Sequence, residues 1–435
     1  MELLFKDITV ISMENGRGPY KTCVGIDKGK ISFLGEYTAG LTAKRVIDGT
    51  DKLLMPGLYN CHTHTPMSLM RGYASDLNLQ DWLFNHIIPV EQKFAEGMTY
   101  TGALISAAEM ISNGVISFSD MYFMLEGVAG AVCESGMKAN LSNALTAFSP
   151  EYDYFKDRSY TDTAYILDNY HKHMDGRIKA DVSIHAEYTS NGRAWRQAVD
   201  YAKENSLIMH LHLSETQEEH ENCKRKYGMT PAQVFNSHGV FDVMTIAAHC
   251  VWLEEADIEI LKEKGVTVVH NPVSNLKLSS GIAPIDSMIK AGLNVALGSD
   301  GPASNNSQDL LADLKTASIL QKYHTGDPSS LPANEALKLV TVNGAKAQGR
   351  ERESGRIGLG LDADIIMLDL HNPRLTPFID PAATLVYSCT GRDVELTMCK
   401  GRILYEKGEY KTIDIEKSLF EAKQAVNKLG IRHYN

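Results

Sequence analysis

The chain has 435 residues, which is too many for one ordinary core and enough for a full α/β barrel with a smaller companion domain. Hydrophobic residues make up 43% and charged residues 22%, values near the averages of folded domains, which exclude extensive disorder and fibrous repeats. The formal net charge of −11, with no Lys/Arg cluster to reverse it locally, argues against a nucleic-acid partner, whereas a small neutral or zwitterionic substrate meets no such obstacle.

Targeting and cysteine patterns point to the cytoplasm. No stretch resembles a secretory signal peptide or is long enough to span a bilayer, so we expect a cytoplasmic protein without membrane contact. The seven cysteines are scattered without any C-x-x-C pair, which predicts neither a disulfide framework nor a thiolate zinc site. We interpret them as small buried hydrophobic residues.

Residues 1–54 are predicted to form short antiparallel strands. The segments LLFKDITVISM and KTCVGIDKGKISFLGE alternate apolar and polar residues around a Gly-Lys turn. We assign this range to the N-terminal part of a small β domain.

Residues 55–355 are predicted to form a (β/α)8 TIM barrel. From Leu53 to about Ser304, short β-branched runs alternate with longer amphipathic stretches, as in repeated βα units around a parallel sheet. Eight such units are what a closed barrel needs. The candidate strands are LLMPGLYNCHTH, GVISFSDMYF, MKANLSNAL, IKADVSIHAEY, SLIMHLHLSE, MTIAAHCVWL, GVTVVHNPVSN and NVALGSDGPASN.

Residues 356–435 return to strand-like sequence, in GLDADIIMLDL, AATLVYSC and VELTMCKGRILYEKGEY, with glycine-containing turns. The economical interpretation is a small β-sandwich domain assembled from both ends of the chain, with the barrel inserted between them, because domain termini commonly lie close together. The predicted fold class is therefore α/β, a TIM barrel with a small β-sandwich.

Six of the eight candidate strands end in polar, chemically capable residues. In a barrel these ends share one face, where the βα loops build active sites. We therefore expect side chains that are distant in sequence to converge there, namely His62, His64, His185, His212, Glu215, His249 and Asp300.

His62 and His64 close the first candidate strand. Side chains alternate along a strand, so both imidazoles point the same way and can bind one ion. An H-x-H pair alone is weak evidence, because two such histidines often occur by chance on a surface. The apolar run LLMPGLYNC before the pair, and the histidines and aspartate at later strand ends, favour a metal site.

The segment LIMHLHLSE supplies His212 at a strand end and Glu215 three residues later. A neutral imidazole suits zinc, and a nearby carboxylate can move the protons of a bound water. The alternative is that Glu215 only stabilises the positive N-terminus of the next helix. His210 faces the same side but lies deeper, and we interpret it as a barrel-interior residue or a partner of the ligands, not as a ligand.

His249 and Asp300 complete the candidate set. Asp300 enters a turn rich in Gly, Ser and Asn, so a turn-forming role is an alternative; a carboxylate there could also bind zinc and accept a proton from the water that the metal activates. His249 either binds the metal or orients the water, and the sequence leaves this open. No lysine ends the fourth strand, where a carbamylated lysine could bridge two metals, so we predict a single-metal site.

Together these motifs resemble the amidohydrolase superfamily over nearly the whole chain. Within the superfamily they resemble the methylthioadenosine/S-adenosylhomocysteine deaminase family. The same group also contains triazine chlorohydrolases and guanine deaminases. The motifs that carry the resemblance are MPGLYNCHTH, HLSET, AAHCVWL, HNPVSNLKLSSG and LGSDGPASNN. The resemblance implies one divalent metal per subunit, usually zinc, held by His62, His64, His212 and Asp300.

The resemblance also implies roles in the reaction. His249 positions the attacking hydroxide, Glu215 protonates the purine ring nitrogen, and Asp300 takes the proton of the water. Iron, manganese or nickel remain alternatives to zinc, because imidazole and carboxylate ligands do not discriminate strongly among these metals. A homo-oligomer is implied as well, whose neighbouring subunit contributes to the pocket.

The segment from Ser68 to Phe94 resembles the family's capping segment. There the matching Glu91 hydrogen-bonds the ribose hydroxyls and Trp82 helps to wall the pocket; the alternatives are a solvated helix residue and a core aromatic. His185 matches a family substrate contact. Asn143 stands where relatives have an arginine, and residues 149–160 do not match a second one, which should weaken recognition of the carboxylate of S-adenosylhomocysteine.

The leading hypothesis is a zinc-dependent deaminase of adenosine-type nucleosides: methylthioadenosine, adenosine or 5′-deoxyadenosine, with S-adenosylhomocysteine less favoured. A second hypothesis keeps the metal chemistry but changes the substrate to guanine, a pterin or a triazine, and Glu91 discriminates between the two. A third is a non-catalytic assembly protein, which would be expected to lack part of the ligand set.

Overall fold

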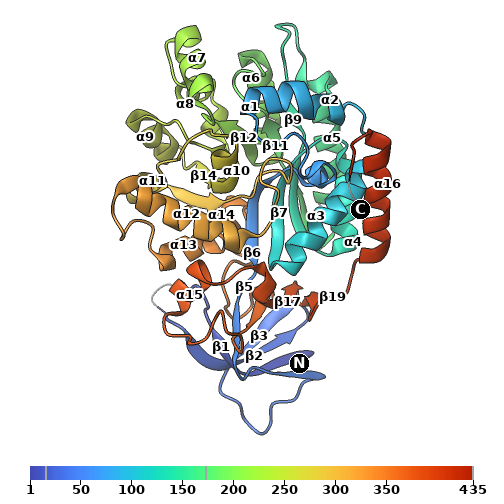
Figure 1. The fold of residues 1–435 in the computed structure, drawn as a ribbon, viewed down its shortest axis with the longest axis vertical. Coiled ribbons are helices and arrows are strands. Elements are labelled where there is room, and N and C mark those ends of the chain that lie inside the picture. Colours follow the sequence, from blue (N-terminus) through green and yellow to red (C-terminus); the bar gives the residue numbers. More distant parts are fainter. Residues whose placement is uncertain (15–16, 172–173, 434–435) are drawn as a thin grey trace.

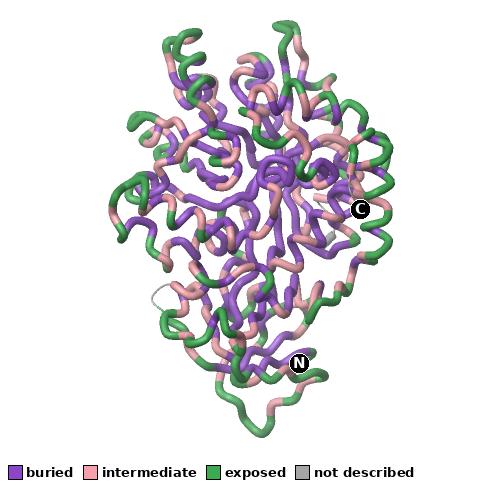
Figure 2. The backbone as a smooth tube through the Cα atoms, in the orientation of Figure 1, coloured by how far each residue is buried: buried purple, intermediate pink, exposed green. Residues whose placement is uncertain are grey.

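The computed structural model describes residues 1–14, 17–171 and 174–433. The chain forms an α/β structure with two parts (Figure 1). The larger part contains parallel strands surrounded by helices, and the smaller part is a β-sheet that includes the first strands of the chain. Buried residues run through the middle of the larger part and continue into the smaller one (Figure 2).

The larger part contains two sheets in which all strand pairs are parallel. A four-stranded sheet has the order β10-β8-β7-β6, with β6 (Leu58–Thr63), β7 (Val115–Met121), β8 (Lys138–Ser142) and β10 (Ile178–Ala180). A six-stranded sheet has the order β15-β14-β13-β12-β11-β9, with β9 (Ala144–Leu145), β11 (Val182–Ile184), β12 (Met209–Leu213), β13 (Thr245–His249), β14 (Thr267–His270) and β15 (Asn294–Leu297).

These strands lie in the eight segments predicted from the sequence, with one difference. The first segment is divided at Gly57: β6 follows it, but the half before it, β5 (Lys52–Pro56), belongs to the smaller sheet. A Cβ atom at Gly57 would lie 2.5 Å from Cγ1 of Ile116, so the close approach of β7 explains why glycine stands at this division.

The two parallel sheets meet where single residues separate consecutive strands. Asn143 lies between β8 and β9, and Asp181 lies between β10 and β11, so the chain passes between the sheets at both places. Beyond β15, the amide of Asp300 donates a hydrogen bond to the carbonyl of His62 at 3.0 Å. The carboxyl ends of strands from both sheets therefore lie close together.

The surrounding helices start at residues with the expected capping chemistry. Thr230 and Gln233 form a capping box at α8 (Pro231–Ser237), and the side chain of Asp309 accepts hydrogen bonds from two amides at the start of α12 (Leu310–Thr325). Among the described residues, no helix has the length and apolar character that a membrane crossing requires.

The α-helices are α1 (Leu79–Asp81), α2 (Ile88–Glu91), α3 (Met98–Ser112), α4 (Leu125–Ser135), α5 (Arg158–Ile166), α6 (Gly192–Asn205), α7 (Gln217–Tyr227), α8 (Pro231–Ser237), α9 (Glu255–Glu263), α10 (Pro272–Lys277), α11 (Ile285–Ala291), α12 (Leu310–Thr325), α13 (Ala333–Leu339), α14 (Val342–Ala347), α15 (Pro381–Tyr387) and α16 (Ile415–Leu429). Short 3-10 or π segments are η1 (Thr65–Met70), η2 (Trp82–Ile87), η3 (Tyr154–Lys156), η4 (Leu167–His171), η5 (Met174–Gly176), η6 (Val240–Asp242) and η7 (Gly391–Asp393).

The smaller sheet combines strands from both ends of the sequence. Its order is β19-β18-β17-β16-β5-β1-β2-β3, with β4 paired to β1, and β5 and β16 are antiparallel neighbours. All nine strands are hydrogen-bonded into one sheet. A sandwich has two sheets packed face to face, so the predicted β-sandwich stays a prediction. The further strands are β1 (Leu3–Val10), β2 (Tyr20–Asp27), β3 (Lys30–Gly35), β4 (Arg45–Asp48), β16 (Ile365–Asp369), β17 (Val394–Cys399), β18 (Arg402–Glu406) and β19 (Glu409–Tyr410).

One segment that we predicted as strand-like is helical. Most of AATLVYSC lies in α15, so the prediction of a strand was wrong there. The side chain of Asp380 accepts a hydrogen bond from the amide of Ala383, and Pro381 occupies the first turn, where it favours a helix. Short apolar runs do not distinguish a strand from a buried helix, and these start signals should have decided the prediction.

Helix α16, in the range that we assigned to the small β domain, lies on the larger part of the structure (Figure 1). It packs against α3 and η1. Its Ala425 and Leu429 belong to a hydrophobic cluster that also contains Met67, Trp82 and Phe94. The C-terminal helix therefore supports the segment between β6 and α3.

A buried lysine connects the two parts of the structure. The Nζ of Lys138, in β8, donates hydrogen bonds to Asp362 at 2.7 Å and Asp364 at 2.6 Å, shortly before β16. Lys30 forms an ion pair with the same Asp362 from the smaller sheet, but its side chain is 49% exposed, whereas that of Lys138 is 1% exposed. Removal of one partner from a buried charge cluster leaves an uncompensated charge.

We expect Lys138→Met to lower the free energy of unfolding by about 3–5 kcal/mol, because it leaves the buried carboxylate of Asp364 without its cation. Lys30→Met is the matched control, and it should cost no more than about 1 kcal/mol because exposed ion pairs contribute little. Urea denaturation of both variants measures the difference. Equal destabilisation by the two substitutions would contradict this account.

Candidate active site

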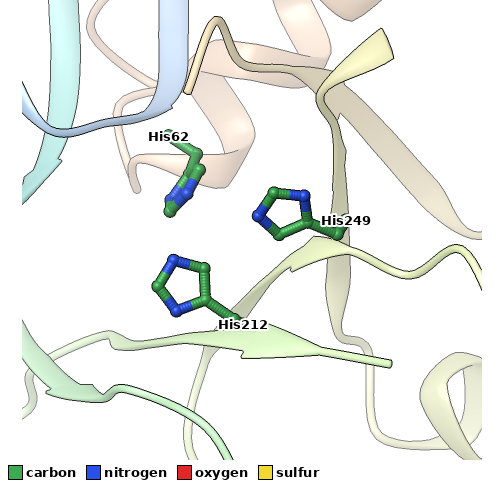
Figure 3. Close-up of side chains that lie close together, drawn as sticks. All are labelled: His62, His212 and His249. Carbon is green, nitrogen blue, oxygen red and sulfur yellow. The ribbon is translucent and has the colours of Figure 1, made fainter. Parts of the chain in front are cut away.

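Histidines from three strands point toward one another at the carboxyl ends of the sheets. His62 lies one residue before the end of β6, His212 lies in β12 and His249 ends β13 (Figure 3). The ring of His62 lies 4.9 Å from that of His212 and 5.4 Å from that of His249, centroid to centroid. One ligand atom from each of the three lies within 4.8 Å of the others, a spacing that fits one metal ion.

Asp300 and His64 extend this cluster. Oδ1 of Asp300 lies 3.3 Å from Nε2 of His64 and 3.5 Å from Nε2 of His62, and these three residues form a second group with metal-ligand spacing. The Asp300 backbone has φ 59°, in the left-handed region, which is a strained conformation often found at functional sites.

Hydroxyl groups hold the Asp300 carboxylate in this position. Its Oδ2 accepts hydrogen bonds from Oγ of Ser274 at 2.6 Å and Oγ of Ser304 at 3.0 Å, and the amide of Gly301 donates to Oδ1 at 2.7 Å. These contacts leave Oδ1 directed toward the histidine rings.

Oxygen acceptors lie behind three of the rings. Nδ1 of His64 lies 2.5 Å from the carbonyl of Met121, and Nδ1 of His212 lies 2.7 Å from the carbonyl of His185. Nδ1 of His249 lies 2.8 Å from Oδ1 of Asn275. An oxygen acceptor requires a proton on Nδ1, so each neutral ring presents the lone pair of Nε2 to the cluster.

The electrostatics of the cluster suit a cation. Burial lowers the pKa of His62 to about 3, against the opposing effect of Asp300, and burial holds the pKa of His212 well below its usual range. Burial also lowers the pKa of His64, but the hydrogen bond to Asp300, the charge of that carboxylate and the hydrogen bond to the carbonyl of Met121 together outweigh burial and raise the value to about 9. The same histidines keep the pKa of Asp300 well below its usual range despite burial. Neutral His62 and His212 beside an ionised carboxylate are the ligands that zinc prefers, and binding of an ion would release the proton of His64.

A cavity of about 620 Å³ opens above the cluster. Its walls include most of the candidate residues, and it receives side chains from the segment between β6 and α3 and from the ends of several strands. His62 is fully buried beneath it. The candidate residues that line the cavity are His64, Trp82, Glu91, Asn143, His185, His212, Glu215, His249 and Asp300.

Glu215 lies where an acid group can reach a bound ligand. Its Oε2 is 3.7 Å from Nε2 of His249, it is 7% exposed, and burial raises the pKa of its carboxyl group. Glu219, which the sequence analysis did not single out, accepts hydrogen bonds from the amides of Ser214 and Glu215 at 3.1 and 2.8 Å. Glu219 therefore fixes the turn that carries Glu215, where Ser214 has φ 47°.

At another side of the cavity, Asn143 supplies no positive charge that could bind an anionic group of a ligand. Its Nδ2 donates a hydrogen bond to Asp162 at 2.8 Å. Arg158 also lines the cavity, which the sequence analysis missed, and its Nε lies 3.8 Å from the same Asp162. The basic group at this wall is therefore already beside a carboxylate.

Sequence reasoning also missed Ser274 and Asn275, which hold Asp300 and His249. Both lie in the motif HNPVSNLKLSSG, directly after β14. Polar side chains that follow a buried strand of a parallel sheet were the available signal, because they fall at the same edge as the histidines.

The combination of parallel strands with an imidazole-carboxylate cluster at their carboxyl ends is the arrangement of a hydrolase with a metal centre. The sequence profile of the Amidohydrolase family matches residues 53–404, and the chain belongs to this family. The resemblance inferred from the motifs is thus confirmed.

Curated relatives and solved structures agree with this assignment. The chain is 41% identical to a 5-methylthioadenosine/S-adenosylhomocysteine deaminase of Acetivibrio thermocellus over 99% of this chain and 100% of the relative. It is 40% identical to a 5′-deoxyadenosine deaminase of Methanosarcina acetivorans over 99% of each chain. An adenosine deaminase of Xanthomonas campestris with bound zinc superposes with a TM-score of 0.93 at 30% identity, covering 99% of this chain and 98% of that one.

We expect the cluster to bind one divalent ion per chain, and Asp300→Asn to lower its zinc affinity by more than about 100-fold, because even the loss of an outer partner of a ligand costs 10–100-fold. Asp286→Asn is the matched control, since Asp286 is 8% exposed and Asp300 6%, but Asp286 lies outside the cavity lining. Competition with a chromogenic chelator measures both affinities. Unchanged affinity in Asp300→Asn would contradict the assignment.

Proposed function

We propose that this protein is a zinc-dependent hydrolytic deaminase of adenosine-type nucleosides, which releases ammonia and gives the inosine analogue. The observation that carries the proposal is the cluster of His62, His64, His212 and Asp300 at the floor of a cavity that also holds Glu215. The deaminase relatives, at about 40% identity over nearly the whole chain, support the same reaction.

In this proposal His62, His64, His212 and Asp300 hold the metal. Three imidazoles that are neutral once an ion is bound, together with an ionised carboxylate, fit a divalent ion, and iron, manganese and nickel remain alternatives to zinc. When bound, such an ion acts as a Lewis acid that makes water a nucleophile at neutral pH.

The reaction assigns protons to two carboxyl groups. Water attacks C6 of the purine, Asp300 takes one of its protons and passes it to the amino group, and ammonia leaves as the C6–N bond breaks. The second water proton, on the C6 hydroxyl, is released as the C6=O bond forms and restores the proton that Glu215 gives to the ring. Glu215 protonates the ring nitrogen N1, a role that its raised pKa favours because the group then carries a proton closer to neutral pH. His249, fixed through Nδ1 by Asn275, orients the attacking water.

The remaining cavity residues set the choice of nucleoside. Glu91 accepts hydrogen bonds from the ribose hydroxyls, His185 contacts the substrate and Trp82 walls the site. Asn143 is already hydrogen-bonded to Asp162, and Arg158 lies beside the same carboxylate. We therefore infer that methylthioadenosine, 5′-deoxyadenosine and adenosine are preferred to S-adenosylhomocysteine, whose carboxylate would need a free guanidinium group.

We also propose how the chain is divided into domains around the site. We infer that the two parallel sheets complete a (β/α)8 barrel over residues 55–355, supported by the hydrogen bond from Asp300 to His62 between its first and last strands. Residues 1–54 and 356–435 contribute the small β domain, with α16 as the part that packs on the barrel.

Assay of the zinc-loaded protein with a panel of adenosine analogues, and with guanine, tests the function through loss of adenine absorbance and release of ammonia. We expect turnover of methylthioadenosine, and a fall in kcat of about 10²–10⁴-fold in Glu215→Gln, which removes the acid group. Glu218→Gln, on the exposed start of α7, is the control. Absence of turnover for all nucleosides, or turnover of guanine alone, would overturn the proposal.

A pH dependence follows from Glu91, because burial raises its pKa to about 7. Above this pH the ionised group accepts hydrogen bonds from the ribose; below it the protonated group is a weaker acceptor. We expect KM for a nucleoside to rise about 3- to 5-fold from pH 8 to pH 6, since a hydrogen bond to a charged group is worth about 1 kcal/mol more and about 1 kcal/mol corresponds to roughly a fivefold change at full protonation.

The substitution Glu91→Gln removes this titration and should give a KM at pH 8 that is already raised and changes little toward pH 6. Glu96→Gln is the control, because Glu96 is exposed in the same segment and does not line the cavity. Steady-state kinetics across this range measure the effect. A Glu91→Gln enzyme with the wild-type pH dependence of KM would show that another group is responsible.

A further inference from the structure

His210 lies two residues before His212 on β12 and is fully buried. Alternation along the strand places both side chains on the same face, with His210 one layer deeper. Its Nε2 is 2.9 Å from Nδ1 of His62, and the two rings are nearly perpendicular at 80°, with centroids 5.0 Å apart. Among the described residues, Nδ1 of His210 has no hydrogen-bond partner, so the contact to His62 is the one that its ring makes.

The contact to His62 differs from those behind the other rings of the cluster. His64, His212 and His249 each face an oxygen, which can only accept a hydrogen bond. His62 faces another imidazole, and either nitrogen of that pair can carry the proton. The tautomer of His62 therefore depends on His210, whereas the tautomers of the other three are fixed by their oxygen partners.

The two possible positions of the proton have different consequences. When Nδ1 of His62 donates to Nε2 of His210, Nε2 of His62 keeps its lone pair and faces Oδ1 of Asp300 and the centre of the cluster. When His210 donates instead, the proton of neutral His62 lies on Nε2, which then cannot bind an ion. Only the first arrangement makes His62 a ligand.

We propose that His210 is a positioning residue of the metal centre, which accepts a hydrogen bond from Nδ1 of His62 and thereby fixes His62 in the tautomer that binds the ion. This inference rests on the proposed metal centre. It explains why an imidazole occupies this buried position, where a polar side chain costs free energy unless its hydrogen bond is used.

Two substitutions of His210 distinguish a side chain that accepts a hydrogen bond from one that only fills the same space. His210→Gln keeps an acceptor, the amide oxygen, and His210→Leu has similar volume without one. We expect zinc affinity, measured by competition with a chromogenic chelator, to fall about 10- to 100-fold in His210→Leu and to stay within about threefold of wild type in His210→Gln. The visible spectrum of the cobalt-substituted protein should be altered in His210→Leu and preserved in His210→Gln.

Thermal unfolding of both metal-free variants controls for loss of the fold. A zinc affinity of His210→Leu equal to that of the wild type would overturn the role of His210. An equal loss of zinc affinity in both folded variants would overturn it as well. Failure of the wild-type chain to bind zinc would instead overturn the proposed function. Neutron diffraction of zinc-bound wild-type crystals needs no variant: we expect a deuteron on Nδ1 of His62 and none on Nε2 of His210, and the reverse would overturn the inference.

Discussion

The hydrogen bonds behind the histidine rings decide what this active site can do. An imidazole can present either nitrogen, and the convergence of several rings has chemical value only if every ring turns a lone pair to the same point. Backbone carbonyls of Met121 and His185 and the amide oxygen of Asn275 enforce this for three rings. Because two of these acceptors are backbone atoms at strand ends, the parallel sheet sets the tautomers of its own ligands.

The convergence of the candidate ligands was within reach of sequence reasoning for a geometric reason. His62 and His212 lie near the ends of buried strands and Asp300 follows one, and the strand ends of a parallel sheet share one edge, so their convergence follows from topology alone. Ser274, Asn275 and Glu219 were not found because their roles depend on particular side-chain hydrogen bonds, which spacing along the chain does not reveal.

The outer parts of the fold were harder to predict for a related reason. The strands from both ends of the sequence were anticipated, but α15 was not, because a short apolar run fits a strand and a buried helix equally well. The contact of α16 with η1 and α3 was also out of reach, since an amphipathic pattern identifies an apolar face without naming the surface that covers it.

The place of α16 has a consequence for biosynthesis. Leu429 shares a hydrophobic cluster with Met67 and Trp82, and Met55 pairs with Ile366, so elements close to the first histidines obtain partners that are translated hundreds of residues later. A growing chain folds from its N-terminal side as it is made. During synthesis, His62 and His64 therefore emerge long before α16, whose side chains pack behind Met67 and Trp82 in the wall of the cavity.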